Sequence, residues 1–411
     1  MAKQDNILVL DVGTTGIKAF VFDAGLHPLA KSYHPLSKSM PHRGWVEQSP
    51  GNILKVSIQA LRDAVRLSGV SKNSLLGLAI TNQRETVILW DKRTGRPVYP
   101  AIVWEDKRTA VKCRKLRRYT EEVGRKTGLP IDPYFSATKA RWILDNVPRA
   151  QQLLLSGNLL FGTVDSWLLW NLLEDHPHRT DYTNASRTLL FNVRTLQWDR
   201  RLLKLFGVPQ EILPEVLPSA AHFGTLKKEI IGRRLPVLAV CGDQQASLFA
   251  AGRRKDTTKV TYGTGAFVGQ VIGRKFKVHK PFFTTLAAHP RRPFYALEAK
   301  VEDCGQDVQR VLPDIAALRK VLTRIAASVA VYLKKLPSAP THIVLDGGAV
   351  RDGYLVGIQA RAADIPTRRH KTYDGTALGA AMLARITAQS QKRRTRIVAA
   401  KEKFISTRAA G

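Results

Sequence analysis

A carboxylate and two amides interrupt an otherwise apolar stretch in the second half of the chain. Within Val240-Cys-Gly-Asp-Gln-Gln-Ala-Ser-Leu-Phe249, Asp243, Gln244 and Gln245 stand between an apolar run and a run of small residues. One interpretation is a helix start, in which Asp243 is the N-cap and accepts hydrogen bonds from the first amides. The other is a site at the carboxyl end of a strand, where α/β proteins tend to bind ligands.

Two turns rich in glycine and threonine suit the binding of phosphate. They are Asp11-Val-Gly-Thr-Thr-Gly16 and Thr261-Tyr-Gly-Thr-Gly265, each between two β-type runs. Successive backbone amides in such turns form anion sites, and threonine hydroxyls add donors. An ordinary hairpin turn explains either one alone, but two in matching positions of two halves favour a phosphate site. Asp11 can also hold a magnesium ion, through water, because Mg²⁺ gives up its hydration shell reluctantly.

A third polar cluster, Thr81-Asn-Gln-Arg-Glu-Thr86, lies between two predicted strands. Arg84 and Glu85 can form a surface ion pair, which contributes little to stability. They can equally point a donor and an acceptor into a cleft, which suits a ligand whose hydroxyls both give and receive hydrogen bonds. The residues alone leave both alternatives open.

The elements that would position these groups follow from the hydrophobic pattern. The N-terminus predicts a β-hairpin and a third strand near Leu29–Tyr33, rather than the strand-to-helix crossover of a doubly wound mononucleotide fold. Further along the first half, the pattern predicts an amphipathic helix at 53–67, strands at 76–81 and 86–90, and helical stretches over 107–126 and 138–155.

A second unit is predicted to begin with a strand at Leu235. It repeats the order of strand, glycine-threonine turn and return strand, so the two halves suggest a duplicated domain closing over a shared cleft. A helix is predicted over 314–336 with Asp314 as its cap, then a strand into Gly347, and a small-residue helix over 376–386. The last twenty-odd residues are a basic helix or a frayed tail, and no function is assigned to them.

Length and composition predict a globular protein. The chain has 411 residues, of which 44% are hydrophobic, enough for a core and two domains. No apolar run approaches the roughly 18 residues of a membrane span, and we expect a soluble, cytoplasmic protein. The cysteines at 113, 241 and 304 are widely spaced and predict neither a zinc site nor disulfides. The lack of a Gly-x4-Gly-Lys-Ser/Thr motif argues against a P-loop enzyme.

The net charge of +32 raises the question of a polyanionic partner. Basic residues occur along most of the chain, with peaks at 107–126 and 392–408, and neither peak interleaves aromatic residues as a surface for single-stranded nucleic acid would. We therefore expect a solvated basic surface that attracts anionic nucleotides, rather than a specific nucleic-acid site.

Eight stretches in order along the chain resemble the FGGY carbohydrate kinases, and within that family the glycerol kinases. They are Gly44-Trp-Val-Glu47, Thr81-Asn-Gln-Arg-Glu-Thr86, Ala101-Ile-Val-Trp-Glu-Asp-Lys-Arg-Thr109, Thr127-Gly-Leu-Pro-Ile-Asp-Pro-Tyr-Phe-Ser136, Asp181-Tyr-Thr-Asn-Ala-Ser-Arg187, Gly242-Asp-Gln-Gln245, Thr261-Tyr-Gly-Thr-Gly265 and Asp346-Gly-Gly-Ala349. The resemblance implies an α/β fold of the two-domain, actin-like ATPase type (ribonuclease H-like) with an interdomain cleft. The expected domains are residues 1–234 on the polyol side and 235–390 on the nucleotide side, followed by a basic tail, 391–411.

The resemblance also implies a site. Asp243 would be the general base, since phosphoryl transfer needs a carboxylate placed to accept the proton of the attacking hydroxyl. Asp11, through water, and Asp243 would hold Mg²⁺. The implied glycerol contacts are Arg84, Glu85, Trp104, Tyr134, Asp243, Gln244 and Phe267, with Gln245 structural. The implied ATP contacts are Thr14, Thr15, Lys18, Thr264, Gly265, Gly305, Gln309, Gly348 and Asp352.

The sequence departs from the family in several places. Lys18 stands where the glycerol kinases usually have arginine, which binds phosphate as a fork rather than as a point charge. Asp352 stands where they have asparagine near the adenine and therefore lacks an amide donor. The segment Ala299–Pro313 is several tens of residues shorter than in typical members and carries Lys300, Glu302 and Asp303 where the family tends to be apolar.

The resemblance implies ATP-dependent phosphorylation of glycerol to sn-glycerol 3-phosphate by a homo-oligomer, most simply a dimer. Two alternatives stay open from the sequence. One is a kinase for another polyol or sugar of the family; the other is a catalytically weakened protein that binds glycerol or nucleotide, which the shortened segment and Asp352 would explain.

Overall fold

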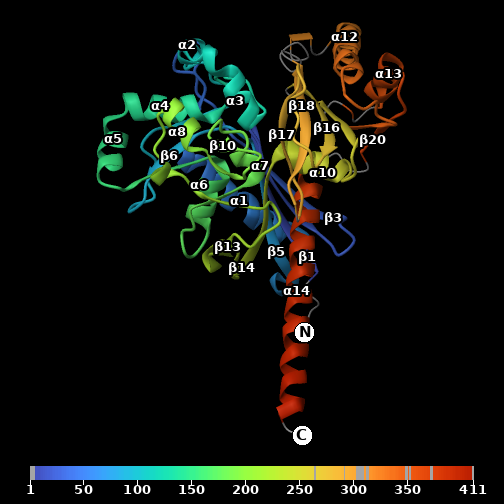
Figure 1. The fold of residues 1–411 in the computed structure, drawn as a ribbon. Coiled ribbons are helices and arrows are strands. Elements are labelled where there is room, and N and C mark those ends of the chain that lie inside the picture. The colour runs from blue at the N-terminus through green and yellow to red at the C-terminus, as the bar shows by residue number, and fades with distance from the viewer. Residues whose placement is uncertain are drawn as a thin grey trace.

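The chain folds into two units, each built around a six-stranded sheet, as the computed structural model shows (Figure 1). In Figure 1 the first unit runs from blue to green and the second from yellow to orange, with the last helix, in red, crossing back to the first. The structure describes residues 5–262, 265–290, 292–301, 310–311, 314–347, 350, 353–370 and 374–409.

The first sheet contains the predicted N-terminal hairpin. Strands β1 and β2 pair antiparallel and β3 continues beside them, while β5 and β14 run parallel to β1. The predicted hairpin and third strand are therefore confirmed. Across the sheet the strands are β13 (Gly224–Leu226), β14 (Leu235–Gly242), β5 (Leu75–Asn82), β1 (Asn6–Val12), β2 (Gly16–Phe22) and β3 (Pro28–Pro35).

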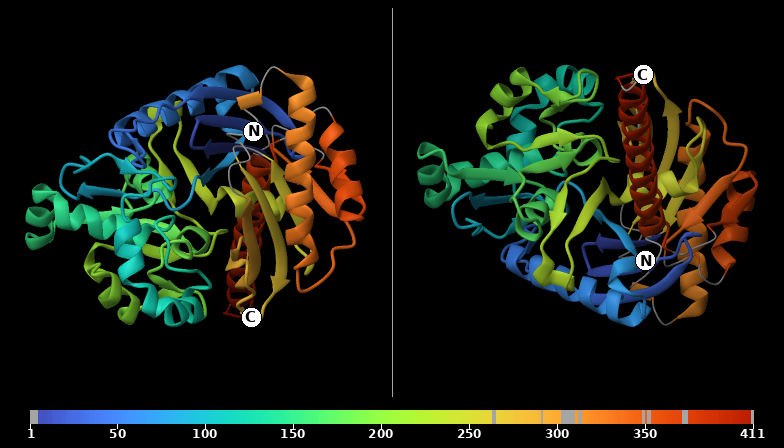
Figure 2. Two further views of the ribbon diagram at one scale, coloured as in Figure 1. Left: turned by 90° about the horizontal axis from the view of Figure 1, so that it is seen from above. Right: turned by 90° about the horizontal axis from the view of Figure 1, so that it is seen from below.

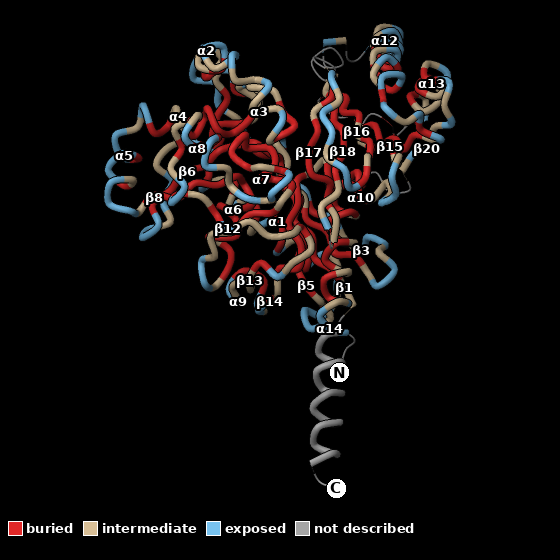
Figure 3. Tube along the Cα trace, viewed as in Figure 1, coloured by how far each residue is buried: buried red, intermediate tan, exposed pale blue. Residues whose placement is uncertain are grey.

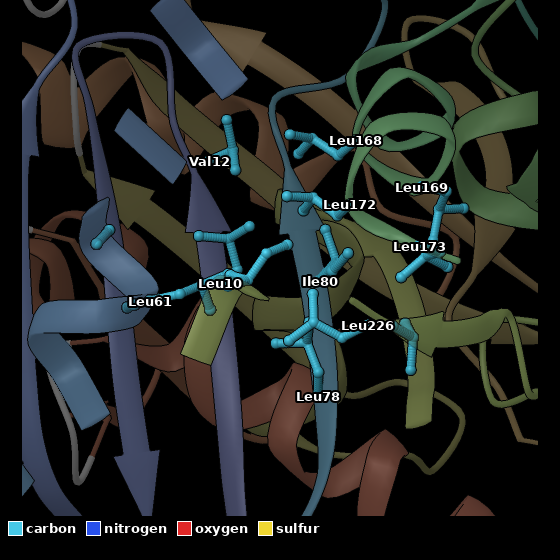
Figure 4. Close-up of a cluster of buried hydrophobic side chains, with 14 of the residues drawn as sticks. Leu10, Val12, Leu61, Leu78, Ile80, Leu168, Leu169, Leu172, Leu173 and Leu226 are labelled. Atoms are coloured by element: carbon cyan, nitrogen blue, oxygen red, sulfur yellow. The ribbon is translucent and has the colours of Figure 1, made fainter. Parts of the chain in front are cut away.

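Both faces of this sheet are covered, so its central strands are almost continuously apolar. On one face Leu10, Leu78 and Ile80 pack with Leu61 of α1 (Pro50–Ser68) and Leu168 of α6 (Val164–Leu172), as Figure 4 shows. On the other face the alternate residues of β1 and β5 pack against α10 (Asp243–Ala251) and α14 (Gly375–Ala409). Figure 3 shows these strands as buried along most of their length.

Strand β14 corrects the predicted division of the chain. It was expected to open the second unit, but it pairs in parallel with β5 in the first sheet. The predicted boundary between residues 234 and 235 therefore separates this strand from its own sheet. An apolar run shows that a strand exists, but its pattern does not say which of two sheets it joins.

The second sheet repeats the hairpin of the first. Strands β15 and β16 pair antiparallel across the predicted turn, and β19 and β20 continue in parallel beside β15. Helices α12 (Ile315–Lys334) and α13 (Tyr354–Ala363) lie on its outer side, as the view from above shows (Figure 2, left). Asp314 caps α12 as expected, accepting from the amides of Ala316 and Ala317. The strands in order are β17 (Phe283–Ala287), β18 (Phe294–Val301), β16 (Ala266–Gly273), β15 (Thr258–Tyr262), β19 (Ile343–Asp346) and β20 (Thr367–Arg369).

Helices α10 and α14 join the two units. Leu248 of α10 packs against β16, β17 and β18, while other residues of α10 and α14 pack on the first sheet. The two helices cross closely at Gly379, where a Cβ atom would lie 1.8 Å from the carbonyl oxygen of Ala246, so only glycine fits. The small-residue helix predicted at 376–386 is confirmed, and it continues as one helix to Ala409 beyond the body of the molecule (Figure 1).

The remaining elements build the outer part of the first unit. The helical stretches expected over 107–126 and 138–155 are each divided, the second at Pro148, which starts a new helix because it cannot continue the previous one. The short strands pair as β4 (Glu47–Gln48) with β7 (Ala101–Ile102), β6 (Ile88–Asp91) with β8 (Leu159–Gly162), β9 (Arg179–Asp181) with β12 (Glu215–Leu217) and β10 (Phe191–Asn192) with β11 (Gln197–Trp198). The helices are α2 (Ala110–Lys115), α3 (Thr120–Thr127), α4 (Ser136–Asn146), α5 (Pro148–Leu155), α7 (Tyr182–Ala185), α8 (Arg200–Phe206) and α9 (Lys228–Ile231), with the 3₁₀ turns η1 (Lys72–Ser74), η2 (Arg117–Tyr119) and η3 (Gln210–Ile212).

In the part of the chain that the structure describes, no helix is both long and apolar enough to cross a membrane. Cys113 and Cys241 are buried free thiols, as expected. Cys304 lies outside the described residues.

Candidate active site

Three parallel strands of the first sheet end side by side, and polar residues follow each end. In the register of β1, β5 and β14, Asp11 lies opposite Thr81, which in turn lies opposite Cys241. The first glycine-threonine turn, the Arg84 cluster and Asp243 therefore meet at one edge of the sheet. Parallel α/β sheets characteristically place their ligand sites at this edge.

Asp243 is the first residue of α10 and not its N-cap, which is Gly242. The capping interpretation of Asp243 is therefore wrong. One carboxylate oxygen, Oδ1, accepts a hydrogen bond of 2.7 Å from the Gln244 amide and lies 3.2 Å from Nε of Arg84. The amide of Gly242 donates to the hydroxyl of Thr183 at 2.8 Å, which fixes the backbone directly before the carboxylate.

The surroundings of Asp243 tune it toward proton transfer. Burial raises its pKa to about 6, the nearby positive charge of Arg84 opposes that rise, and the negative charge of Glu85 adds to it. The side chain keeps 30% of its surface exposed, so a substrate hydroxyl can reach it. A carboxylate with a pKa near neutrality is well matched to act as a general base.

Arg84 and Glu85 are buried, at 3% and 1% exposure. This excludes the surface ion pair and leaves the interpretation in which both groups serve the site. Glu85 adopts a left-handed backbone conformation with φ of 62°. Such strain in a residue that is not glycine is characteristic of functional sites, where the surrounding structure holds it in place.

Two further charged residues complete this group, and sequence reasoning did not assign either to the site. Glu298 of β18 accepts hydrogen bonds from Arg84 at 2.7 and 3.0 Å and from Arg187 at 3.0 Å. Arg187 Nε also lies 2.5 Å from a carboxylate oxygen of Glu85. Although burial opposes ionisation, the two guanidinium groups lower the pKa of Glu298 to about 2. We call Arg84, Glu85, Arg187 and Glu298 the buried charge network; it carries two positive and two negative charges.

Aromatic rings lie beside this network, and such rings are typical of ligand pockets. Trp104 and Tyr134 contact edge to face, with ring centroids 5.5 Å apart. The carbonyl of Tyr134 accepts a 2.7 Å hydrogen bond from the buried Lys139. Phe267 lies on β16 and lines a cavity. That cavity is lined by Gln244, Gln245, Leu248, Lys259, Phe267, Val268, Gly269, Thr285, Ala296, Leu297 and Glu298.

The two glutamines after Asp243 differ in role. Gln245 is buried, accepts from Arg84 at 3.2 Å and donates to Thr285 at 3.3 Å, which supports its predicted structural role. The side-chain oxygen of Gln244 lies 3.3 Å from both Lys259 Nζ and Thr261 Oγ1. Gln244 therefore links α10 to the strand that leads into the second glycine-threonine turn.

The first glycine-threonine turn contacts Trp104, one of the predicted glycerol contacts. Thr14 Oγ1 accepts from the indole nitrogen of Trp104 at 2.9 Å and donates to Gln83 at 3.2 Å. Thr15 is exposed beside it. Lys18 Nζ lies 3.2 Å from Asp374 and 3.9 Å from Asp11, so its charge is held at the same edge of the sheet.

Several predicted nucleotide contacts are not placed. Gly265 directly precedes β16 and lies beside the ring of Phe267. Thr264, Gly305, Gln309, Gly348 and Asp352 lie outside the described residues.

The carboxylates available for a metal ion are few but suitable. Burial raises the pKa of Asp11, and the negative charge of Asp11 in turn helps to raise the pKa of Asp243. Among the described residues, no group of three or more His, Cys, Asp or Glu side chains is placed to hold a metal ion. Magnesium commonly uses only one or two protein carboxylates and keeps several waters, so Asp11 and Asp243 fit it.

The comparisons with known proteins agree on one family. Residues 6–250 match the N-terminal domain of the FGGY family of carbohydrate kinases. Glycerol kinase of Pseudothermotoga lettingae is 36% identical over 444 positions, covering 92% of this chain and 89% of the relative. Glycerol kinase of Alcanivorax borkumensis is 42% identical over 341 residues, covering 80% and 68%. Because the 444-position alignment is longer than this 411-residue chain, the first relative carries segments that have no counterpart here.

Solved structures show the same fold. The crystal structure of Plasmodium falciparum glycerol kinase with ADP has a TM-score of 0.86 at 24% identity, covering 99% of both chains. Xylulose kinase from Rhodospirillum rubrum has a TM-score of 0.81 at 19% identity, covering 93% of this chain and 89% of its own. The predicted fold, a two-domain actin-like ATPase, is confirmed. The extent of the profile match and of the curated relatives shows that this chain belongs to the FGGY family of carbohydrate kinases.

Proposed function

We propose that this chain transfers the γ-phosphoryl group of ATP to a terminal hydroxyl of glycerol, giving sn-glycerol 3-phosphate and ADP. The observation that carries the proposal is Asp243 at the carboxyl end of β14, 3.2 Å from a buried arginine and at the same edge of the sheet as the turn that contains Thr14. The relatives named glycerol kinase, at 36% and 42% identity, support the choice of acceptor.

Each part of the site has a role in this reaction. Asp243 accepts the proton of the attacking hydroxyl, and its pKa of about 6 keeps it ionised at neutral pH. Arg84 and Glu85 bind the other hydroxyls as donor and acceptor, while Trp104 and Tyr134 cover the carbon skeleton. Burial of these groups strengthens each polar contact and excludes water, which would otherwise compete as the phosphoryl acceptor.

The two glycine-threonine turns are the proposed binding site for the phosphates of ATP. Backbone amides and the hydroxyls of Thr14 and Thr15 would bind the phosphates, and Lys18 would contribute a positive charge. A magnesium ion held by Asp11, through water, and by Asp243 would neutralise charge on the phosphates. The cytoplasmic location and the homodimeric state expected from the sequence remain parts of this proposal.

A coupled ADP-release assay with glycerol and ATP tests the activity. We expect glycerol-dependent turnover, reduced about 10²- to 10⁴-fold by Asp243→Asn, since the proton acceptor is lost. Asp175→Asn is the matched control, because Asp175 is an exposed aspartate of the same unit, outside the site. Absence of glycerol-dependent ADP release, or equal rates for Asp243→Asn and wild type, would contradict the proposal. A panel of other polyols and sugars in the same assay tests the acceptor.

A further inference from the structure

A lysine from the second unit lies among the aromatic rings of the polyol pocket. Lys300 is two residues beyond Glu298 on β18, so both side chains are on the face directed at the first unit. Its Nζ lies 4.9 Å from the ring centroid of Trp104 and 5.8 Å from that of Tyr134. In the register of β16 and β18, Lys300 lies opposite Phe267.

Among the described residues, no carboxylate forms an ion pair with Lys300. Within the buried charge network, Glu85 and Glu298 balance Arg84 and Arg187. Among the residues that the structure describes, Lys300 forms no ion pair, and the contacts of its ammonium group are the faces of the two rings. Cation–π contacts of this kind contribute only about 0.5 to 2 kcal/mol. With respect to the described part of the chain, an anionic group entering the pocket would therefore bind Lys300 at the cost of only these weak ring contacts.

We propose that Lys300 contacts the acceptor and extends the acceptor range to short polyhydroxy carboxylic acids. This inference rests on the proposed kinase function. The carboxylate of such an acid would lie against Lys300, and its terminal hydroxyl would lie at Asp243. The hydroxyl oxygen bonds to the γ-phosphorus as the bond between that phosphorus and the β–γ bridging oxygen breaks, and the hydroxyl proton passes to Asp243. The products are the phosphorylated acid and ADP.

The neighbouring acids do not exclude an anionic acceptor. Glu85 is paired with Arg187, and Asp243 lies 3.2 Å from Arg84, so each negative charge has a guanidinium beside it. Hydrogen bonds between an ammonium and a carboxylate are roughly twice as strong as those between neutral groups. The same lysine therefore favours an acid more than it favours the corresponding neutral triol.

The test measures kcat/KM for D-glycerate and L-glycerate, with glycerol as the reference acceptor in the same coupled assay. We expect turnover of one glycerate enantiomer by the wild type, with the phosphorylated acid identified by mass spectrometry. Lys300→Met should lower kcat/KM for glycerate by about tenfold or more and change it much less for glycerol. Lys300→Arg should retain most of the glycerate activity because it keeps the charge.

Lys275→Met is the matched control, since Lys275 is an exposed lysine of the same unit and the variant has the same net charge as Lys300→Met. Glycerol turnover without glycerate turnover would overturn this inference and leave the proposed function standing. An equal loss for both acceptors in a folded Lys300→Met variant would also overturn it. No turnover with either acceptor would overturn both. Competition of glycerate with glycerol in the wild type, which needs no variant, would support it.

Discussion

The carboxylate of Glu298 lies 2.7 Å from Nη1 of Arg84, although the two residues are 214 positions apart and belong to different sheets. The same guanidinium approaches Asp243 through Nε at 3.2 Å. Arg84 therefore connects the candidate base in the first unit to a strand of the second. Because the group is buried, any movement that separates Glu298 from Arg84 would break two hydrogen bonds between charged groups in a poorly solvated place.

Glu298→Gln is expected to lower the free energy of unfolding by about 3 to 5 kcal/mol, because it leaves Arg84 and Arg187 under-compensated. Urea unfolding at pH 7 measures this loss. Glu215→Gln is the matched control: Glu215 forms an ion pair of 2.9 Å with Arg179, but its side chain is 58% exposed, so the cost should stay within about 1 kcal/mol. Equal costs for the two variants would contradict the role of the buried charge network.

The low pKa of Glu298 adds a pH dependence to the same prediction. A carboxyl whose folded-state pKa is about 2, below its ordinary 4.5, stabilises the folded state fully above pH 4.5. That contribution is lost as the pH falls from 4.5 toward 2. The difference in stability between wild type and Glu298→Gln should therefore shrink over this window, and acid titrations followed by circular dichroism would show it.

The kinase rate should fall in acid because Asp243 must be ionised to accept a proton. With a pKa of about 6, kcat/KM for glycerol is expected to fall about tenfold per pH unit below that value. The measurement is a pH series from 8 to 5 in the coupled assay, with circular dichroism at each pH to verify that the protein remains folded. A flat profile between pH 7 and 5 would rule out Asp243 as the base with this pKa.

Thr14→Val should weaken the binding of both substrates. The hydroxyl of Thr14 accepts from Trp104 and donates to Gln83, and valine keeps the shape but loses both hydrogen bonds. Since one such bond contributes about 1 kcal/mol, we expect KM for ATP and KM for glycerol each to rise about fivefold. Thr195→Val, at an exposed position, is the control. A rise in only one KM would show that this hydroxyl does not couple the two sides of the site.

Lys139→Met should change both glycerol binding and the pH dependence of stability. Lys139 donates to the carbonyl of Tyr134, so its loss should raise KM for glycerol a few-fold more than it changes kcat.

Burial lowers the pKa of Lys139 to about 8, whereas lysine in the unfolded chain has the ordinary pKa of 10.5. Between these values the unfolded state binds more protons, so the wild type gains stability as the pH rises, and the variant should lack that gain.

Denaturant midpoints at pH 7.5, 9 and 10 test this difference, with Lys204→Met at an exposed position of α8 as the control. If the stabilities of wild type and Lys139→Met change with pH in parallel, the pKa of Lys139 is not lowered in the folded state and this prediction is wrong.

The parts of the fold that the sequence predicted are those set by local chemistry. Glycine and threonine between β-type runs predicted both hairpins, and Asp314 before an amphipathic run predicted the start of α12. Asp11 and Asp243 were found because each follows an apolar strand, where a polar residue is out of place unless it has a role. These signals need only a few neighbouring residues.

The other parts of the fold and of the site depend on contacts between residues that are far apart in the sequence. Arg187 and Glu298 take part in the site through partners 102 to 214 positions away, so the residues near them in the sequence do not indicate which groups they contact. The only available signal was a charged residue inside an apolar strand, which Glu298 gives within Tyr-Ala-Leu-Glu. The position of β14 depends likewise on its parallel partner β5, which lies about 160 residues earlier in the chain.

The place of α14 also sets when the protein can finish folding. This last helix covers one face of the first sheet, against β1, β5 and β14, which are made about 370, 300 and 140 residues earlier in synthesis. In a nascent chain that has completed β1, β5 and β14, this apolar face therefore lacks α14 until the end of translation. The first half is thus the part most in need of protection on the ribosome, and a chain cut before Gly375 would emerge with that face open.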